Sequence, residues 1–217
     1  MKAHTTTLFS CILCMISIVS TGQKRMNLAA ELQDKKIKAV NRTISLNTNH
    51  PAAVEMDAAE GSGLGILKEI EIENGTIEVE LLGENAPGQS FIGIAFNIQD
   101  DETYEAVYFR PFNFVADEQI QRSHMVQYIN HPQYTWYKLR EERTGEFENE
   151  ISVPPDPEDW FRAKIIVRDD QVKVFVNEID DPVLKVDRLI STKSQKIGLW
   201  TGHGSSGRFR NLVIHPE

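Results

Sequence analysis

The chain has 217 residues, with 23 Lys and Arg against 32 Asp and Glu, which gives a formal net charge of −9 at pH 7. An acidic chain without a basic cluster repels phosphate backbones and anionic lipid surfaces, so nucleic acid and the membrane surface are poor candidate partners. We therefore expect a neutral ligand, no nucleic-acid partner, and no membrane attachment once the leader described next is removed.

The first residues have the pattern of a targeting segment. Lys2 gives a positive start, an apolar run extends from Leu8 to Val19, and Ser20 to Gly22 are small. The run is shorter than a typical membrane-spanning helix, and this order is typical of a secretory signal peptide. We predict a signal peptide over residues 1–22 and a secreted or periplasmic chain. An uncleaved anchor is the alternative.

Both cysteines, Cys11 and Cys14, lie inside this leader. The mature chain therefore has no disulfide and no cysteine ligand for a metal, and its stability must come from a hydrophobic core. Residues 23–36 are polar with a short helix-like pattern, and we interpret them as a linker or a loose helix between the leader and the domain. The remaining residues, 37–217, are enough for one large β-sandwich.

Short apolar segments separated by Gly, Asn, Asp and Pro follow one another from residue 37 to the C-terminus. Such a series, without alternating helices, indicates an all-β sandwich or barrel. We predict strands at residues 38–46, 53–57, 64–72, 76–82, 91–98, 104–112, 125–129, 162–167, 172–176, 196–200 and 208–214. Short helices are expected at residues 136–143 and 186–190.

Asn74-Gly75 is the strongest turn signal, because a type I′ hairpin turn needs a positive φ at both central residues. A two-residue loop there would place Glu71 opposite Glu78 on a face rich in glutamate. Such a face can hold calcium, supply the acid and nucleophile of a glycosidase, or stay solvated and screened by salt. Glu71 and Glu78 are therefore candidate catalytic residues, and calcium is the one cofactor we consider. The alternating glutamates of residues 69–73 resemble the Glu-x-Asp-x-Glu motif of family 16 glycoside hydrolases, but with Glu at the centre.

A weaker turn signal, Asp169-Asp170, predicts a second hairpin. It would pair Val167 with Val172 and Ile165 with Val174, which gives an apolar face.

The segment 91–114 carries the densest pattern. One face of its first strand is bulky: Ile92, Ile94, Phe96 and Ile98. The other face is mostly small, with Gly93 and Ala95, because strand side chains alternate. The next strand turns Tyr108 and Arg110 to one side. If the bulky faces form the core, the small face borders an aromatic face that carries an arginine. This predicts a groove for a ligand with polar edges and flat apolar patches, such as a sugar. The alternative is a sheet face covered by loops.

Several polar residues near this groove are candidates for ligand binding. Pro111 cannot donate a ladder hydrogen bond, so the strand ends near Arg110, whose planar guanidinium suits vicinal hydroxyls. An ion pair with an acidic neighbour is its alternative role. Asn113 and Gln127 offer donors and acceptors. His124 is a candidate base, with a purely structural role as the alternative.

The connection 130–159 is long for a compact sandwich, and such loops are often functional. Its Trp136 could stack on a sugar or close the edge of the core. We predict substrate binding by Tyr108, Arg110, Asn113, Gln127 and Trp136, and no metal site.

The C-terminal third resembles a known family. Gly198-Leu199-Trp200, a Gly-rich loop and the strand 209–214 resemble the end of domains in the concanavalin A-like lectin/glucanase superfamily. Trp160-Phe161 and residues 172–177 resemble the paired strands before that ending. Within the superfamily the chain is most similar to bacterial secreted 3-keto-disaccharide hydrolase-like and laminin-G-like domains. The resemblance implies a jelly-roll sandwich of two antiparallel sheets, one of them concave, over residues 37–217, and a carbohydrate partner. It transfers no catalytic residues.

We therefore expect a secreted carbohydrate-active protein that binds a glycan or modified disaccharide on the concave sheet and, if it is an enzyme, hydrolyses it. The alternative is a non-catalytic, laminin-G-like binding or adhesion module. The sequence leaves open which of the two it is.

Overall fold

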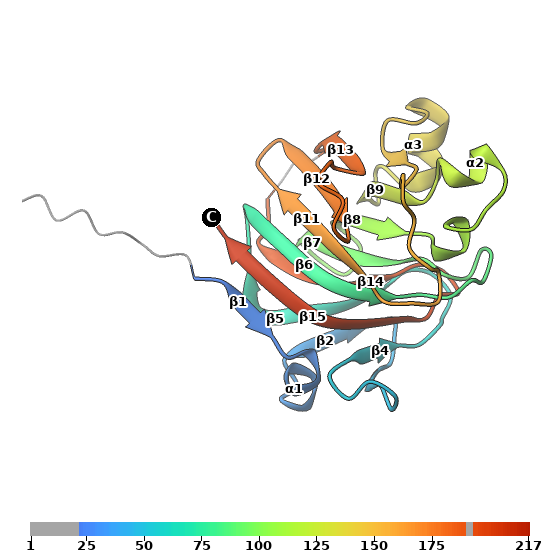
Figure 1. Cartoon of the computed structure of the whole chain (residues 1–217). Helices are drawn as coiled ribbons and strands as arrows, with labels where there is room; N and C mark the ends of the chain where they lie inside the picture. Colours follow the sequence, from blue (N-terminus) through green and yellow to red (C-terminus); the bar gives the residue numbers. More distant parts are fainter. Residues whose placement is uncertain (1–21, 190–192) are drawn as a thin grey trace, which may run out of the picture.

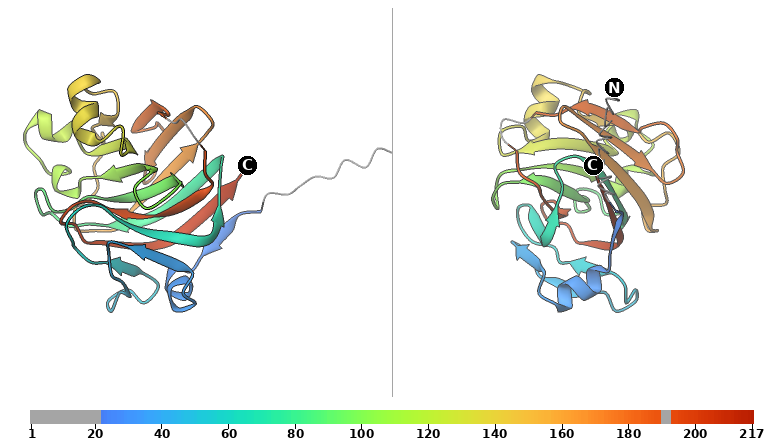
Figure 2. Two further views of the ribbon diagram at one scale, coloured as in Figure 1. Left: turned by 180° about the vertical axis from the view of Figure 1, so that it is seen from behind. Right: turned by 90° about the vertical axis from the view of Figure 1, so that its left-hand side faces the viewer.

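The computed structural model describes residues 22–189 and 193–217. Two antiparallel sheets pack against each other, and α1 and α3 lie at opposite ends of the sandwich (Figures 1 and 2). This confirms the predicted all-β jelly-roll of two sheets. Residues 1–21 of the predicted signal peptide lie outside the described part. Within that part, no helix is long and apolar enough to cross a membrane.

The first sheet, which we call the outer sheet, has the order β13-β12-β11-β6-β15-β4-β3, with β1 also pairing with β15. Its strands are β1 (Lys24–Met26), β3 (Ile44–Leu46), β4 (Val54–Met56), β6 (Gly75–Leu82), β11 (Phe161–Val167), β12 (Gln171–Val176), β13 (Leu184–Asp187) and β15 (Gly207–Pro216).

The second sheet, which we call the inner sheet, has the order β10-β9-β8-β7-β14-β5-β2. Its strands are β2 (Ile37–Val40), β5 (Gly63–Glu71), β7 (Ile92–Ile98), β8 (Tyr104–Phe109), β9 (Val126–His131), β10 (Glu148–Asn149) and β14 (Lys196–Thr201). The helices are α1 (Leu28–Gln33), α2 (Gln119–Arg122), α3 (Trp136–Glu142) and the 3-10 turn η1 (Pro111–Asn113).

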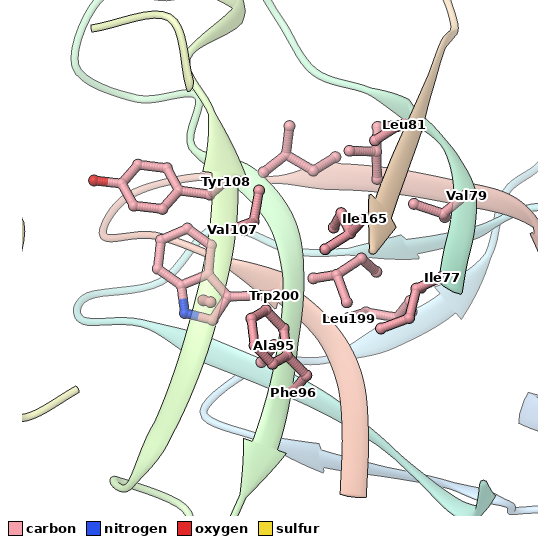
Figure 3. Packing of buried hydrophobic residues seen from close by; sticks show 14 of the residues in the cluster. Ile77, Val79, Leu81, Ala95, Phe96, Val107, Tyr108, Ile165, Leu199 and Trp200 are labelled. Atoms are coloured by element: carbon pink, nitrogen blue, oxygen red, sulfur yellow. The ribbon is translucent and has the colours of Figure 1, made fainter. Parts of the chain in front are cut away.

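The two sheets differ in how their strands are buried. In β11 and β12 of the outer sheet, buried residues alternate with half-exposed ones, so one face meets solvent. In β7 and β8 every residue is buried. One face of the inner sheet meets the core between the sheets, where Figure 3 shows Leu199 of β14 near Ile77 of β6. The other face must be covered as well, and it carries the site described below.

Each predicted strand overlaps an observed one, and residues 38–46 divide into β2 and β3 at Asn41, which has a φ of 51°. The helix at 136–143 is confirmed as α3. Residues 184–187 form strand β13, so the helix predicted at 186–190 is wrong over its described residues. The linker interpretation of residues 23–36 is also wrong, because β1 pairs with β15 and Leu28 of α1 is fully buried.

The hairpin at Asn74-Gly75 is not formed, because β5 and β6 lie in different sheets. Gly75 has a φ of 152°, and a Cβ there would lie 2.3 Å from the carbonyl oxygen of His215. The glycine therefore permits a close approach to β15 where the chain crosses between sheets. Glu78 lies opposite Lys164 of β11, not opposite Glu71, and opposite charges across a strand pair are favourable.

The hairpin at Asp169-Asp170 is confirmed. Val167 pairs with Val172 and Ile165 pairs with Val174, as the alternation of apolar residues predicts.

Candidate functional site

A cavity of about 680 Å³ opens over the covered face of the inner sheet. Its floor contains Tyr108 of β8 and Trp200 of β14, which both pair with Gly93 of β7, one on each side. The two rings lie 4.7 Å apart between centroids. A Cβ at Gly93 would lie 2.1 Å from the carbonyl oxygen of Val107 and 2.6 Å from the Cα of Tyr108. The small residue at this position therefore allows the aromatic floor to form.

Arg110 follows β8 directly and is almost fully buried beneath the cavity. Its Nη1 donates to the carbonyl oxygen of His124 at 2.8 Å. Its Nη2 donates to the hydroxyl of Tyr108 at 2.8 Å and to Oε1 of Gln127 at 2.5 Å. Burial lowers the pKa of Arg110, but a guanidinium stays charged at any ordinary pH. With both Nη atoms engaged, Arg110 acts first as a support that positions Tyr108, Gln127 and the backbone of His124.

Glu148 of β10 is buried behind the cavity residues His124 and Arg140, and it lies opposite Gln127 in the strand register. Its carboxylate accepts two hydrogen bonds from Arg140, from Nε at 3.0 Å and from Nη2 at 2.7 Å. Its Oε2 also lies 2.9 Å from Nδ1 of His124. The fork of a guanidinium matches a carboxylate in this way, so Glu148 is held in one orientation.

The contact with Glu148 determines the form of His124. A carboxylate only accepts hydrogen bonds, so the hydrogen of the neutral ring lies on Nδ1 and the lone pair on Nε2. Burial lowers the pKa of His124, and the neighbouring Glu148 only partly opposes this effect. The ring is therefore neutral near pH 7 and presents a lone pair as a base, which is the arrangement that general-base catalysis requires.

The structure brings most of the predicted binding residues together. Tyr108, Arg110, Asn113, His124 and Trp136 line the cavity, and Gln127 lies beneath it, bonded to Tyr108 and Arg110. Direct contact of these residues with a ligand stays a prediction.

The two glutamates of the first predicted hairpin do not reach this cavity. Glu71 is exposed at the end of β5 and borders a different hollow. Glu78 lies on the solvent face of the outer sheet, where its Oε1 is 3.3 Å from Nε2 of His215. The glutamate pair that would act as acid and nucleophile is therefore not formed, because the two residues belong to different sheets.

Several residues at the cavity were not among the sequence-based candidates. They include Arg140, Trp200 and His203, which line it, and Glu148, which contacts Arg140 and His124. Glu148 belongs to a strand of two residues inside the long connection, which has no alternation that could reveal it. Arg140 lies four residues after Trp136 on α3, with its guanidinium 5.1 Å from the Trp136 ring. The i, i+4 spacing in the predicted helix was the one available signal for this pair.

The rim of the cavity is aromatic and partly open. Phe91 packs edge-on against Tyr108 and Phe112, and the side chain of Trp136 is 47% exposed. Flat apolar surfaces beside a charged interior suit a small ring with one apolar face and polar edges. Among the described residues, no group of three or more His, Cys, Asp and Glu side chains is arranged to hold a metal ion.

Solved structures with the same fold include three at low sequence identity. The carbohydrate binding module CBM66 from Bacillus subtilis is 13% identical, with a TM-score of 0.59 over 82% of this chain and 93% of that one. A putative glycosyl hydrolase from Parabacteroides distasonis is 11% identical, with a TM-score of 0.53 over 84% and 89%. The exoplasmic/lumenal domain of VIP36, bound to Ca²⁺ and Man3GlcNAc, is 9% identical, with a TM-score of 0.54 over 83% and 82%. At these identities the likeness shows the fold alone.

No curated protein sequence matches the chain. The family model of the 3-keto-alpha-glucoside-1,2-lyase-like domain matches residues 29–215, which is nearly the whole of the described sandwich. This confirms the resemblance to 3-keto-disaccharide hydrolase-like domains, and the chain belongs to the family of 3-keto-alpha-glucoside-1,2-lyase-like domains.

Proposed function

We propose that this protein binds a glycoside carrying a ketone at C3 and cleaves its glycosidic bond by elimination between C1 and C2. The observation that carries the proposal is His124, which lines a cavity of sugar size and has its Nδ1 held by Glu148, so that Nε2 is left to act as a base. Family membership supports the substrate class, since the family is described by a 1,2-lyase activity on 3-keto-glucosides.

The chemistry needs a base and a stabilised oxyanion. A ketone at C3 acidifies the hydrogen on C2, because the electron pair left behind delocalises onto the ketone oxygen. His124 takes this proton on Nε2, and an enolate forms across C2, C3 and the oxygen. The enolate then collapses, a C1–C2 double bond forms, and the bond from C1 to the glycosidic oxygen breaks. The proton returns to the departing oxygen, so the products are an unsaturated keto sugar and an alcohol.

The charges around the cavity favour the enolate. Arg110 and Arg140 are both cationic and Glu148 is anionic, so with His124 neutral this group carries a net positive charge. A fixed positive field in a site shielded from water stabilises negative charge that develops in the transition state. The buried carboxylate offsets the charge of the second guanidinium, and burial keeps the histidine deprotonated, which the first step requires.

A carbohydrate ligand is also supported by the rim and by the neighbouring folds. Phe91, Phe112 and Trp136 offer the flat surfaces on which a sugar ring stacks. CBM66 is named as a carbohydrate binding module, and VIP36 is seen with Man3GlcNAc. Export through the predicted leader, and with it action on periplasmic or extracellular glycosides, is part of the proposal.

Two other outcomes remain distinct from elimination. A hydrolase would add water and release the intact keto sugar, and a non-catalytic module would bind without forming a product. The name of the CBM66 neighbour favours the module as the second candidate.

The test is to incubate the purified chain with 3-keto-glucosides and with their unoxidised parents, and to analyse the products by mass spectrometry. We expect a sugar product lighter by one water than the hydrolysis product, from the keto substrates only. His124→Gln should lower turnover by roughly 10²- to 10⁴-fold, the usual contribution of a general base. Binding without product would favour the module, and a product containing one added water would favour hydrolysis.

A further inference from the structure

Three histidines line the cavity: His124, His131 and His203. Each has its Nδ1 held by a different partner, and that partner determines whether Nε2 carries a hydrogen or a lone pair. A ring nitrogen can donate or accept according to which tautomer its other nitrogen imposes. The partners therefore reveal what each histidine can do for a ligand.

His203 lies in the loop between β14 and β15, and its Nδ1 accepts a hydrogen bond of 3.0 Å from the backbone N–H of Gly61. A backbone N–H can only donate, so this Nδ1 must carry a lone pair and the hydrogen must lie on Nε2. His203 is consequently a donor at Nε2.

The other two histidines have the opposite form. Nδ1 of His124 faces the carboxylate of Glu148, and Nδ1 of His131 lies 2.5 Å from the carbonyl oxygen of Glu102. Both partners only accept, so both rings carry a hydrogen on Nδ1 and a lone pair on Nε2. Of the three rings, His203 alone offers a hydrogen bond to a ligand oxygen through Nε2.

The partner of His203 is fixed by the buried Arg42. One guanidinium nitrogen, Nη2, donates to the carbonyl oxygens of Gly61 at 2.8 Å and Gly202 at 2.7 Å, and thereby ties the two loops together. Gly204 donates to Ala59 at 2.8 Å and closes the same junction. The hydrogen bond from Gly61 to His203 therefore belongs to a rigid part of the wall.

His203 and His124 lie on opposite walls of the cavity. His203 follows β14 and His124 precedes β9, and the strand order β9-β8-β7-β14 separates them by three strand spacings. At about 4.8 Å a spacing, the backbones are roughly 14 Å apart, which suits one sugar ring with a side chain on either side.

We propose that His203 donates its Nε2–H to the ketone oxygen of the bound 3-keto sugar. This inference rests on the proposed function and adds the donor that the elimination needs. Both Nη atoms of Arg110 and the fork of Arg140 are already engaged with protein acceptors. A neutral histidine donor polarises a carbonyl without giving up its proton, and it stabilises the enolate oxygen that forms when the base acts.

The test uses two substitutions that separate the two ring nitrogens. In His203→Asn, the new Oδ1 can take the place of Nδ1 and accept the hydrogen bond from Gly61. The shorter side chain has no N–H that reaches the position of Nε2. In His203→Gln, an amide N–H can lie near the position of Nε2, but the variant has no acceptor for the N–H of Gly61. The ligand is a 3-keto C-glucoside, in which carbon replaces the glycosidic oxygen, so that it binds without elimination.

We expect His203→Asn to weaken binding of the C-glucoside by roughly tenfold in a calorimetric titration, and His203→Gln to weaken it less. With a ¹³C-labelled ketone, the carbonyl stretch of the bound ligand should lie at a lower frequency in the wild-type chain than in the His203→Asn variant. Turnover of the matching O-glucoside should likewise fall more in His203→Asn than in His203→Gln.

Equal affinity in the wild-type chain and the Asn variant would overturn the inference. So would a larger loss in the Gln variant, which would show that His203 serves only to position the loop. Tight binding of the ketone without cleavage of the O-glucoside would instead remove the proposed elimination and leave the donor role of His203 supported. A wild-type chain that does not bind the ketone would overturn both.

Discussion

Glu148→Gln tests the centre of the proposed site. The carboxylate accepts three charge-assisted hydrogen bonds, at 3.0 and 2.7 Å from Arg140 and at 2.9 Å from His124. Gln has nearly the same shape but keeps a single acceptor oxygen, and its NH2 group must face one of the donors. The substitution therefore removes the ion pair and places a donor against a donor, while the volume of the side chain stays the same.

The size of the effect follows from the burial of the two partners. The Glu148 side chain is only 4% exposed, whereas Arg140 is 31% exposed and regains some hydration when its partner is lost. A hydrogen bond to a charged group contributes about 1.5–3 kcal/mol, and partial exposure lowers that value. We expect the free energy of unfolding to fall by about 2–3 kcal/mol. The melting temperature of a domain of this size should then fall by about 4–12 °C.

The matched control is Glu146→Gln. Glu146 pairs with Arg143 at 2.6 Å, but this side chain is 53% exposed, so the loss should be at most about 0.5 kcal/mol. Urea denaturation followed by tryptophan fluorescence measures both variants. Turnover of a 3-keto-glucoside should fall by roughly 100-fold or more in Glu148→Gln only, because His124 loses the acceptor that fixes its tautomer. Equal stability of the two variants would refute the assignment of Glu148 as the anchor of the site.

Four further outcomes are expected. Glu105→Gln should lower the free energy of unfolding by about 3–5 kcal/mol in urea denaturation, because its fully buried carboxylate is 2.5 Å from Arg188. The control Glu178→Gln breaks an exposed ion pair and should lower it by at most about 0.5 kcal/mol. Similar losses in the two variants would contradict this prediction. Gly93→Ala should cost about 2 kcal/mol or more in the same assay, since its Cβ would meet backbone atoms, and an unchanged urea midpoint would show that the strands can separate. The value of kcat/KM should fall as the pH is lowered, with a midpoint below 6.5, because burial lowers the pKa of His124 and the neutral ring is the active form. A midpoint above 6.5 would be inconsistent with His124 as the base. Glu78→Gln should leave turnover within about twofold of the wild-type value, because Glu78 pairs with His215 on the solvent face of the outer sheet, and a large loss would restore it as a catalytic candidate.

The candidate site was predictable where the pattern was local. Alternation along residues 91–98 and 104–112 predicted a small face next to an aromatic one, and Gly93 beneath Tyr108 and Trp200 confirms that geometry. Pro111 indicated the end of the strand, so Arg110 could be placed near the groove. Its part in the site was less predictable, since the donors expected to bind a ligand instead support Tyr108, Gln127 and His124.

The Asn74-Gly75 hairpin shows where local rules fail. The dipeptide satisfies the requirement of a type I′ turn, but β5 and β6 bury their apolar residues as members of different sheets. Tertiary packing therefore overrides the turn propensity. Glu71 and Glu78 consequently do not face each other, and the opposed glutamate face on which the catalytic and calcium hypotheses depended is not formed.

The sequence by itself determined the class of fold, most of the strands and the two-sided character of the segment 91–114, because these depend on side chains a few residues apart. Only the tertiary structure decided which strands are neighbours, and with them the contacts among Glu148, Arg140 and His124 and the approach of Gly61 to His203. These contacts join segments that carry no common pattern, and they depend on a sheet register that is set by the packing of the whole core.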